Sequence, residues 1–304
     1  MDESDLRLIN LLVHDPRATY RDLADALGVS VQAVHRRIQQ LMEEKVILGF
    51  SATISAAYLE AVPVTIFGTS CNRSREDTIK SLTGNELVSG ILFGSGGATY
   101  VYCMLHRSGE LEGLFATVKK AAGLKDAWIG LDNVTRTGKA LTTVREQPLS
   151  SLDRRIISSL ARNCRRSAAE VALEQGVTAA TVNRRLARME EMGAIEYVLG
   201  LHPGFSGDVA SVIRIEMAEG ADRSLLIASM RRSFGPTIDY YRTFSNIPSI
   251  FTCVAWTRTL KDLEVMMDKV LSEKDVLRAV PDIIFTGWYF PTWKDIMAAD
   301  HSRD

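Results

Sequence analysis

Arginine and amide side chains recur at helical spacing in two segments of the sequence. "VSVQAVHRRIQQLMEEKVI" covers residues 29–47, and "VTAATVNRRLARMEEMGAI" covers residues 177–195. Gln32, Arg36 and Gln40 are four residues apart, so they project from one face of a helix. Arginine can donate two hydrogen bonds to guanine, and glutamine can pair with adenine, in the major groove of DNA. The pattern therefore predicts hydrogen bonds to the edges of bases.

The surrounding residues predict how this helix is positioned. Leu6, Ile9 and Leu12 indicate a first helix, and Pro16 ends it. We expect a second helix from the cap Thr19 to Gly28, and a third from the cap Ser30 to about Glu44. The apolar positions of the third helix, which should pack inward, are Val34, Ile38 and Leu41, with Val182, Leu186 and Met189 in the second segment. Three helices joined by a tight glycine turn form a helix-turn-helix.

The sequence repeats with a period of 148 residues, which aligns residues 5–47 with 153–195 without a gap. An ordinary helical bundle with arginines on its surface is the alternative interpretation of either copy. Two copies that both keep the Arg36-Arg37 pair, as Arg184-Arg185, favour nucleic-acid binding. The first-copy residues that meet an identical residue are Asp5, Arg7, Ile9, Leu12, Arg17, Ala24, Gly28, Val29, Val34, Arg36, Arg37, Glu43 and Ile47.

The overall charge of −1, from 36 basic and 37 acidic residues, neither favours nor excludes a polyanionic partner. The two repeats differ locally. Residues 1–50 hold six Lys or Arg against eight Asp or Glu, whereas residues 151–200 hold eight against six. We therefore expect the second copy to bind phosphates more strongly.

Behind each helical segment, the pattern changes to strands and helices in the order βαββαβ. In the first copy the strands are "AVPVTIFGTS", "LVSGILFGS", "TYVYCML" and "DAWIGLDNVTR", and the helices are "REDTIKSLTG" and "ELEGLFATVKKAAG". This order predicts a ferredoxin-like unit with one face of an antiparallel sheet left for a partner. The apolar segments "KVILGFSATIS" and "GAIEYVLGLHP" before these units indicate the wing of a winged helix.

These segments together resemble the Lrp/AsnC family of transcriptional regulators, in which a winged helix-turn-helix precedes a ferredoxin-like RAM domain. The resemblance implies an α+β chain with two such units, which pair within the chain as a pseudo-dimer, and further association into a homo-oligomer. It implies a sequence-specific DNA-binding regulator rather than an enzyme. The expected domains are helix-turn-helix units at 1–50 and 153–198, ferredoxin-like units at 51–140 and 199–304, and a linker at 141–152.

Fifteen residues are candidates for contact with double-stranded DNA: twelve lie on the third helix of a copy or cap it, and Arg17, Arg165 and Arg166 precede the second helix. We expect base contacts from Gln32, His35, Arg36, Asn183 and Arg184, and phosphate contacts from Arg17, Arg37, Arg165, Arg166 and Arg185. The remaining candidates are Ser30, Gln40, Thr178, Thr181 and Arg188.

A small-molecule effector is also expected from the resemblance. Amino-acid-responsive members carry a sequence like Gly-Asp-Phe-Asp between the central strands. Neither copy keeps this acidic pair, so the chain lacks the carboxylates that would bind an amino acid there. The glycines of "GSGG" are followed by a strand and not by a helix, so we expect a tight turn and no phosphate-binding loop. The effector candidates are Ser95, Gly96, Gly97, Thr99, Tyr240, Arg242, Ser245 and Asn246.

Siroheme decarboxylases share this two-unit plan and provide the alternative function, a tetrapyrrole enzyme. Tyr240 and Arg242 match two positions of their "HNYxR" pattern, but Ile238 occupies the histidine position. The four cysteines are single and the histidines lack HxxxH and HExxH spacing, so we expect no metal and no cofactor. The acidic start and the absence of a long apolar run predict a cytoplasmic protein without a membrane contact.

Overall fold

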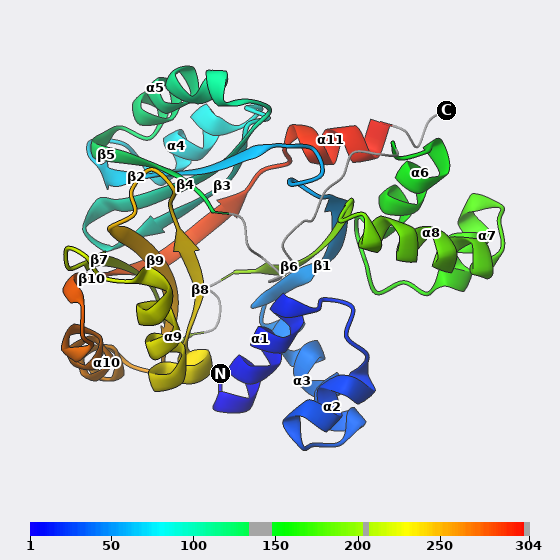
Figure 1. Cartoon of the computed structure of the whole chain (residues 1–304), viewed down its shortest axis with the longest axis horizontal. Coiled ribbons are helices and arrows are strands. Elements are labelled where there is room, and N and C mark those ends of the chain that lie inside the picture. The colour runs from blue at the N-terminus through cyan, green and yellow to red at the C-terminus, as the bar shows by residue number, and fades with distance from the viewer. Residues whose placement is uncertain (134–147, 203–206, 301–304) are drawn as a thin grey trace.

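The computed structural model describes residues 1–133, 148–202 and 207–300. In Figure 1 a large sheet with its covering helices lies on the left, and two small helical units lie on the right and below. Strands β1 (Ile47–Ile54) and β6 (Ile195–Leu201) lie between the two helical units. The helical units are therefore beside each other, although they are far apart in the sequence.

The two helical units confirm the three-helix prediction. In the first, Thr19 caps the second helix, and Gly28 ends it with a left-handed conformation at φ 68°. In the second, Thr178 caps the third helix and Gly176 repeats the left-handed turn at φ 66°. The helices are α1 (Glu3–His14), α2 (Tyr20–Leu27), α3 (Val31–Glu43), α6 (Ser151–Leu160), α7 (Ala168–Gln175) and α8 (Ala179–Glu191).

The segment after each third helix forms a strand, and the two strands pair with each other. β1 and β6 are antiparallel, with Phe50 opposite Leu199 and Ile54 opposite Ile195. The expected wings are thus one two-stranded ribbon that joins the two units. A single hydrophobic core also runs through both units, since Leu8 and Leu12 belong to the same buried cluster as Ile157 and Leu160.

Each ferredoxin-like unit has the predicted βαββαβ order. The first contains β2 (Val62–Ser70), α4 (Arg75–Leu82), β3 (Val88–Gly94), β4 (Ala98–Leu105), α5 (Leu111–Ala121) and β5 (Leu124–Leu131). The second contains β7 (Val209–Met217), α9 (Arg223–Phe234), β8 (Ile238–Thr243), β9 (Ile250–Thr257), α10 (Leu260–Ser272) and β10 (Val276–Tyr289), followed by α11 (Trp293–Asp300). Short 3₁₀ turns cover Ser95–Gly97, Ser108–Glu110 and Gly235–Thr237.

The strands of both units form one eight-stranded sheet in the order β5-β2-β4-β3-β10-β7-β9-β8. Its centre is β10, whose first half pairs with β7 and whose last residues pair with β3. The two end strands also meet, because the Asn133 amide donates to the Thr243 carbonyl at 2.9 Å and the Ser245 amide donates to the Leu131 carbonyl at 2.9 Å. The sheet therefore curls until its ends touch.

The curled sheet encloses an inner core, and the helices cover its outer faces. Phe67 and Tyr100 of the first unit pack in one buried cluster with Val212, Phe244 and Ile250 of the second. The rings of Phe67 and Phe244 are stacked, with centroids 5.8 Å apart. Separate clusters lie under α4 and α5 and under α9 and α10. The two ferredoxin-like units thus bury their open faces against each other.

The boundaries of the elements refine the expected domains. β1 extends to Ile54, and α6 begins at Ser151, inside the expected linker. Residues 141–147 of that linker lie outside the described residues. The "GSGG" segment confirms the predicted tight turn, since it forms a 3₁₀ turn between β3 and β4 with Gly96 at φ 61°.

Candidate nucleic-acid interface

The third helix of the first unit presents the predicted polar face to solvent. Gln32, His35 and Arg36 are exposed, and so is Gln40 one turn later. The opposite face is fully packed, because Val34, Ile38 and Leu41 are at most 2% exposed. The Ser30 hydroxyl accepts a hydrogen bond from the Ala33 amide at 3.2 Å, so Ser30 caps this helix.

The equivalent helix of the second unit has the same orientation. Asn183 and Arg184 are exposed, while Val182, Leu186 and Met189 are buried. The Thr178 hydroxyl caps the helix through the Thr181 amide at 3.1 Å. All five candidates for base contacts therefore lie on free surfaces of α3 and α8, with three on α3 and two on α8.

The second arginine of each pair points back to the first helix of its own unit. In the first unit, the Arg37 guanidinium contacts Asp5 at 2.6 Å and Asp2 at 2.8 Å. The hydrogen bond to Asp5, together with that to Asp2, raises the pKa of Arg37. Arg37 therefore holds α3 against the start of α1.

In the second unit, one buried carboxylate on α6, that of Asp153, holds the third helix through its arginines. Asp153 is 1% exposed, and its oxygens lie 3.3 Å from Arg185 and 3.7 Å from Arg188. The Ser150 amide and hydroxyl also donate to Asp153, at 2.8 and 2.7 Å. Phosphate contact by Arg37 and Arg185 and DNA contact by Arg188 stay predictions. These three side chains also hold the third helix of their unit in position.

Three other candidates for phosphate contact are also held by the protein. Arg165 donates to the carbonyl oxygens of Pro16 at 2.9 Å and Ala18 at 2.8 Å, so it crosses from the second helical unit to the first. Arg17 crosses in the other direction, donating to the Tyr197 hydroxyl at 3.0 Å. Arg166 stays within its unit and lies 2.6 Å from a carboxylate oxygen of Glu174.

These arginines could not be distinguished by sequence from the arginines that face solvent, because both kinds belong to cationic segments. We did not predict that Asp5 and Asp153 would bind Arg37 and Arg185. The repeat nevertheless contains a sequence signal for these carboxylates. Asp5 and Asp153 are aligned identical residues in the repeat, as are Arg37 and Arg185, and such a doubly repeated pair of opposite charges indicates a contact.

The effector candidates fall into two groups that do not come together. Ser95, Gly96, Gly97 and Thr99 lie at the turn beside the end of β2, where Gly68 is opposite Thr99. The second group lies near the beginning of β2, where β5 brings Leu131 opposite Val64. In this group the Asn246 amide nitrogen donates to the Ile129 carbonyl at 2.8 Å, and its oxygen accepts from the Leu131 amide at 2.7 Å. In the first group, the Ser95 hydroxyl accepts from the Ile283 amide at 3.0 Å, so each group contains a residue that joins the two ferredoxin-like units.

The residues that match the decarboxylase pattern are engaged in the fold. Ile238, at the histidine position, is 1% exposed and belongs to the core of the second ferredoxin-like unit. Arg242 forms an ion pair with Asp132, and its guanidinium lies 4.7 Å from the centre of the Tyr102 ring. Burial is the largest influence on the pKa of Asp132 and raises it despite the neighbouring Arg242. The last remaining candidate, Tyr240, has a backbone φ of 54°.

Neither a metal cluster nor a membrane span occurs in the described part of the chain. No group of three His, Cys, Asp or Glu side chains there could hold a metal ion. Within residues 1–133, 148–202 and 207–300, every helix is too short or too polar to cross a bilayer.

Comparison with known proteins assigns both helical units. Residues 1–42 match the model of the AsnC-type helix-turn-helix domain, and residues 149–196 match a model of winged helix-turn-helix DNA-binding domains. Both segments are thus similar to the DNA-binding domains of Lrp/AsnC regulators, as the sequence predicted. The order of the helices and strands in the structure confirms the predicted helix-turn-helix plus ferredoxin-like architecture.

Lrp/AsnC relatives match part of the chain. The transcriptional regulator Ptr1 of Methanocaldococcus jannaschii is 31% identical over 83 residues, which are 27% of this chain and 56% of that protein. An uncharacterized regulator of Pyrococcus abyssi is 38% identical over 55 residues, 18% of this chain and 37% of its own length. The match thus covers about a third to a half of these relatives.

One solved structure has the same two-unit fold over its whole length. The siroheme decarboxylase NirDL aligns with a TM-score of 0.57 over 98% of this chain and 97% of its own, at 11% sequence identity. At that identity, the likeness concerns the fold alone. The likeness extends over both halves of this chain and not over one unit alone.

Proposed function

We propose that this chain is a cytoplasmic transcriptional regulator that binds duplex DNA through α3 and α8. The observation that carries the proposal is the orientation of these two helices. Each buries its apolar face in a shared core and leaves arginine and amide side chains in solvent. These are the side chains that read base edges in the major groove.

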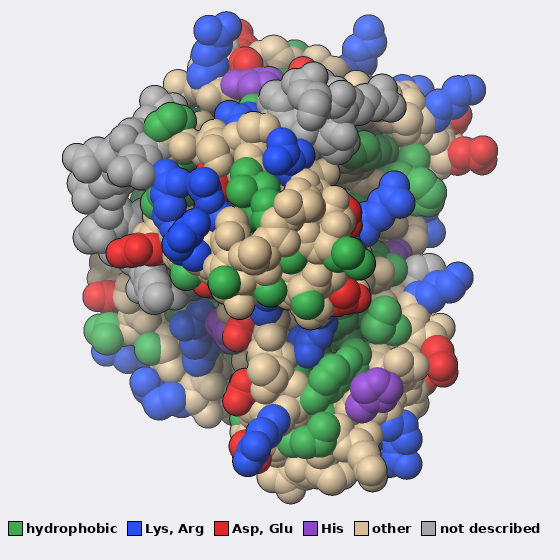
Figure 2. Space-filling view, turned by 90° about the vertical axis from the view of Figure 1, so that its right-hand side faces the viewer, with side chains coloured by type: hydrophobic (Ala, Val, Ile, Leu, Met, Phe, Trp, Pro, Cys, Tyr) green, Lys and Arg blue, Asp and Glu red, His purple; other side chains and the backbone are tan. Residues whose placement is uncertain are grey.

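The connection between the two units supports a joint contact with one duplex. The β1–β6 ribbon and the common core fix the separation of α3 and α8. Figure 2 shows the side of the molecule that carries both units, with Lys and Arg side chains spread across it among Asp and Glu. Paired helix-turn-helix units bind half-sites about one helical turn apart. Because Gln32 and His35 on α3 correspond to Ala180 and Asn183 on α8, we propose that the two half-sites differ in sequence.

The test begins with selection of a preferred duplex from a random library, followed by fluorescence anisotropy titrations. Arg36→Ala and Arg184→Ala should each weaken binding by about 1–3 kcal/mol, through loss of contact with one base pair. Arg107→Ala is the matched control, because Arg107 is exposed on the first ferredoxin-like unit and belongs to neither α3 nor α8. Unchanged affinity in both test variants, or an equal loss in the control, would refute the proposed interface.

A tetrapyrrole enzyme is the second candidate, and the whole-chain likeness to the decarboxylase NirDL is the observation that raises it. The residues of this chain do not favour it, since Ile238 replaces the histidine and Arg242 is paired with Asp132. Absorption spectra of the purified protein with and without added siroheme separate the two candidates. A shifted Soret band combined with negligible, salt-insensitive DNA binding would support the enzyme instead.

We further propose that the two ferredoxin-like units form an intramolecular pseudo-dimer, which associates into larger homo-oligomers. The inner cluster between the units supports the first part. Large apolar side chains on β10 support the second, since Leu277, Phe285 and Trp288 are each at least 50% exposed. Light scattering coupled to size-exclusion chromatography should give a mass above that of one chain.

A further inference from the structure

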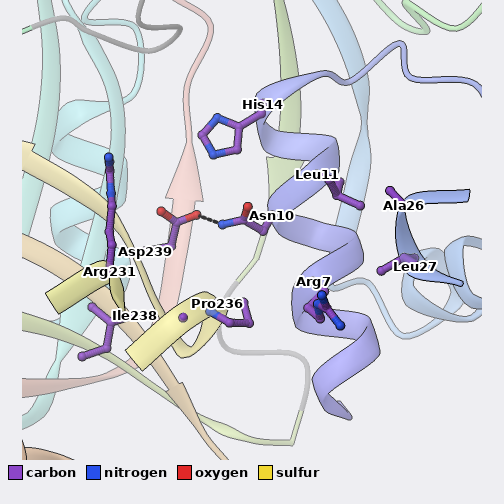
Figure 3. Close-up of a pocket in the computed structure, with 11 residues that line it drawn as sticks. Arg7, Asn10, Leu11, His14, Ala26, Leu27, Arg231, Pro236, Ile238 and Asp239 are labelled. Atoms are coloured by element: carbon purple, nitrogen blue, oxygen red, sulfur yellow. Dashed lines mark hydrogen bonds between the residues drawn. The ribbon is translucent and has the colours of Figure 1, made fainter. Parts of the chain in front are cut away.

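A cavity separates the first helix-turn-helix unit from the second ferredoxin-like unit. It has a volume of about 360 Å³ and lies between α1 and the end of α2 on one side and the α9–β8 connection on the other (Figure 3). The two walls are joined by one hydrogen bond, in which the Asn10 amide donates to the Asp239 carboxylate. The volume is at the lower end of the range of small-molecule sites.

The equivalent junction on the other side of the molecule is filled by the chain itself. There α11 packs against α6 and β1, between the second helix-turn-helix unit and the first ferredoxin-like unit (Figure 1). The Trp293 amide donates to the Glu86 carbonyl at 3.0 Å, and its indole donates to the Met104 carbonyl at 2.9 Å. Glu86 precedes β3 as Pro236 precedes β8, so the cavity occupies the place that corresponds to α11.

The charges that line the cavity favour an anion. Arg7 comes from α1 and Arg231 from α9, whereas Asp239 is the single carboxylate between the walls. The Arg231 guanidinium is already held in place, because it lies 5.1 Å from the centre of the Tyr241 ring. Two guanidinium groups against one carboxylate leave an excess of positive charge in the lining. A bound carboxylate would neutralise this excess and attract both walls.

Apart from His14, the remaining side chains that line the cavity are apolar. Leu11 and Leu27 line it from the helix-turn-helix unit, and Pro236 and Ile238 line it from the ferredoxin-like unit. Such a lining suits a ligand with an apolar body and one charged end. We propose that the cavity binds a small organic monocarboxylate. The ligand would hold the first helix-turn-helix unit against the second ferredoxin-like unit, as α11 does for the second helix-turn-helix unit and the first ferredoxin-like unit.

Calorimetric titration of the full chain without DNA tests this proposal independently of the DNA-binding function. The probes are isovalerate, phenylacetate and indole-3-acetate, each with its neutral amide. We expect at least one acid to bind and to raise the unfolding temperature, and its amide to bind about ten-fold more weakly or not at all, because the amide lacks the charge-assisted hydrogen bonds.

The variants Arg7→Ala and Arg231→Ala should each weaken the acid about ten-fold, the usual effect of losing a charged hydrogen bond. Arg232→Ala is the matched control, since Arg232 is the exposed neighbour of Arg231 on the same helix but does not line the cavity. The proposal is overturned if none of the three acids binds, if acids and amides bind equally, or if the control loses as much affinity as the two test variants.

Discussion

At the scale of single residues, the two arginines of each Arg-Arg pair have different surroundings. Arg36 and Arg184 face solvent, whereas Arg37 and Arg185 reach back to carboxylates at the start of α1 and α6. Each third helix is thus held by carboxylates at the start of the first helix of its own unit. In the second unit this carboxylate, Asp153, is 1% exposed.

Asp153→Asn tests this contact. The amide cannot accept as strongly from Arg185 and Ser150, so the variant should lose about 1–3 kcal/mol of unfolding free energy. Its DNA affinity should fall with the loosened α8. Chemical denaturation and anisotropy measure the two effects. Asp25→Asn is the control, because Asp25 is exposed on α2 and should change neither quantity. Full stability in the Asp153 variant would contradict the positioning part assigned to this carboxylate.

At the scale of elements, local sequence signals predicted helices and strands well. Thr19, Ser30 and Thr178 begin their helices as expected, and Gly28 ends α2, since caps and glycine turns act within a few residues. The pairing of β1 with β6 and of β3 with β10 was not predicted. Strand partners far apart in sequence are chosen by packing, which leaves no mark at fixed spacing. For the same reason the structural contacts of Arg165 could not be foreseen.

The seam where the sheet closes, between β5 and the residues after β8, provides a prediction about the stability of the sheet. Gly130 of β5 lies against Phe244, and a Cβ atom added there would come 2.2 Å from the phenyl ring. Gly130→Ala should therefore force the ring aside and lower the unfolding free energy by about 1–3 kcal/mol. Gly109→Ala, at a position where a Cβ meets nothing within 4 Å, is the control. Thermal unfolding of both variants measures the difference, and equal midpoints would show that the seam tolerates the methyl group.

At the scale of the whole molecule, the two helix-turn-helix units form one structural body. Ile157 of α6 is fully buried in the core that also contains Leu8 and Leu12 of α1. A substitution that destabilises the second helix-turn-helix unit should therefore also destabilise the first, although 148 residues separate the two copies.

Ile157→Ala should cost about 2–4 kcal/mol and increase amide hydrogen exchange in α1 to α3 as well as in α6 to α8. Leu226→Ala, in the separate core of the second ferredoxin-like unit, is the matched control and should leave α1 to α3 protected. Mass spectrometry of exchanged peptides resolves the two patterns. An increase confined to α6 to α8 would mean that the units unfold independently.

Unequal charge between the copies leads to a second prediction at this scale. Residues 1–50 have two more acidic than basic residues, and residues 151–200 have two more basic than acidic ones. Arg184→Ala should therefore reduce total DNA affinity more than Arg36→Ala at low salt, and the gap should narrow as added ions screen the phosphates. Anisotropy titrations over a salt series give this comparison. A larger loss for Arg36→Ala at every salt concentration would reverse the assignment.

The ribbon of β1 and β6 has a consequence for gene control. Regulators assembled from separate subunits dissociate when few copies are present, so their occupancy of a promoter falls steeply with dilution. In the proposed DNA complex, one chain supplies both α3 and α8, and the β1–β6 ribbon keeps the two helices together. Contact of both helices with one duplex should then need no prior association of two chains, even at a few molecules per cell.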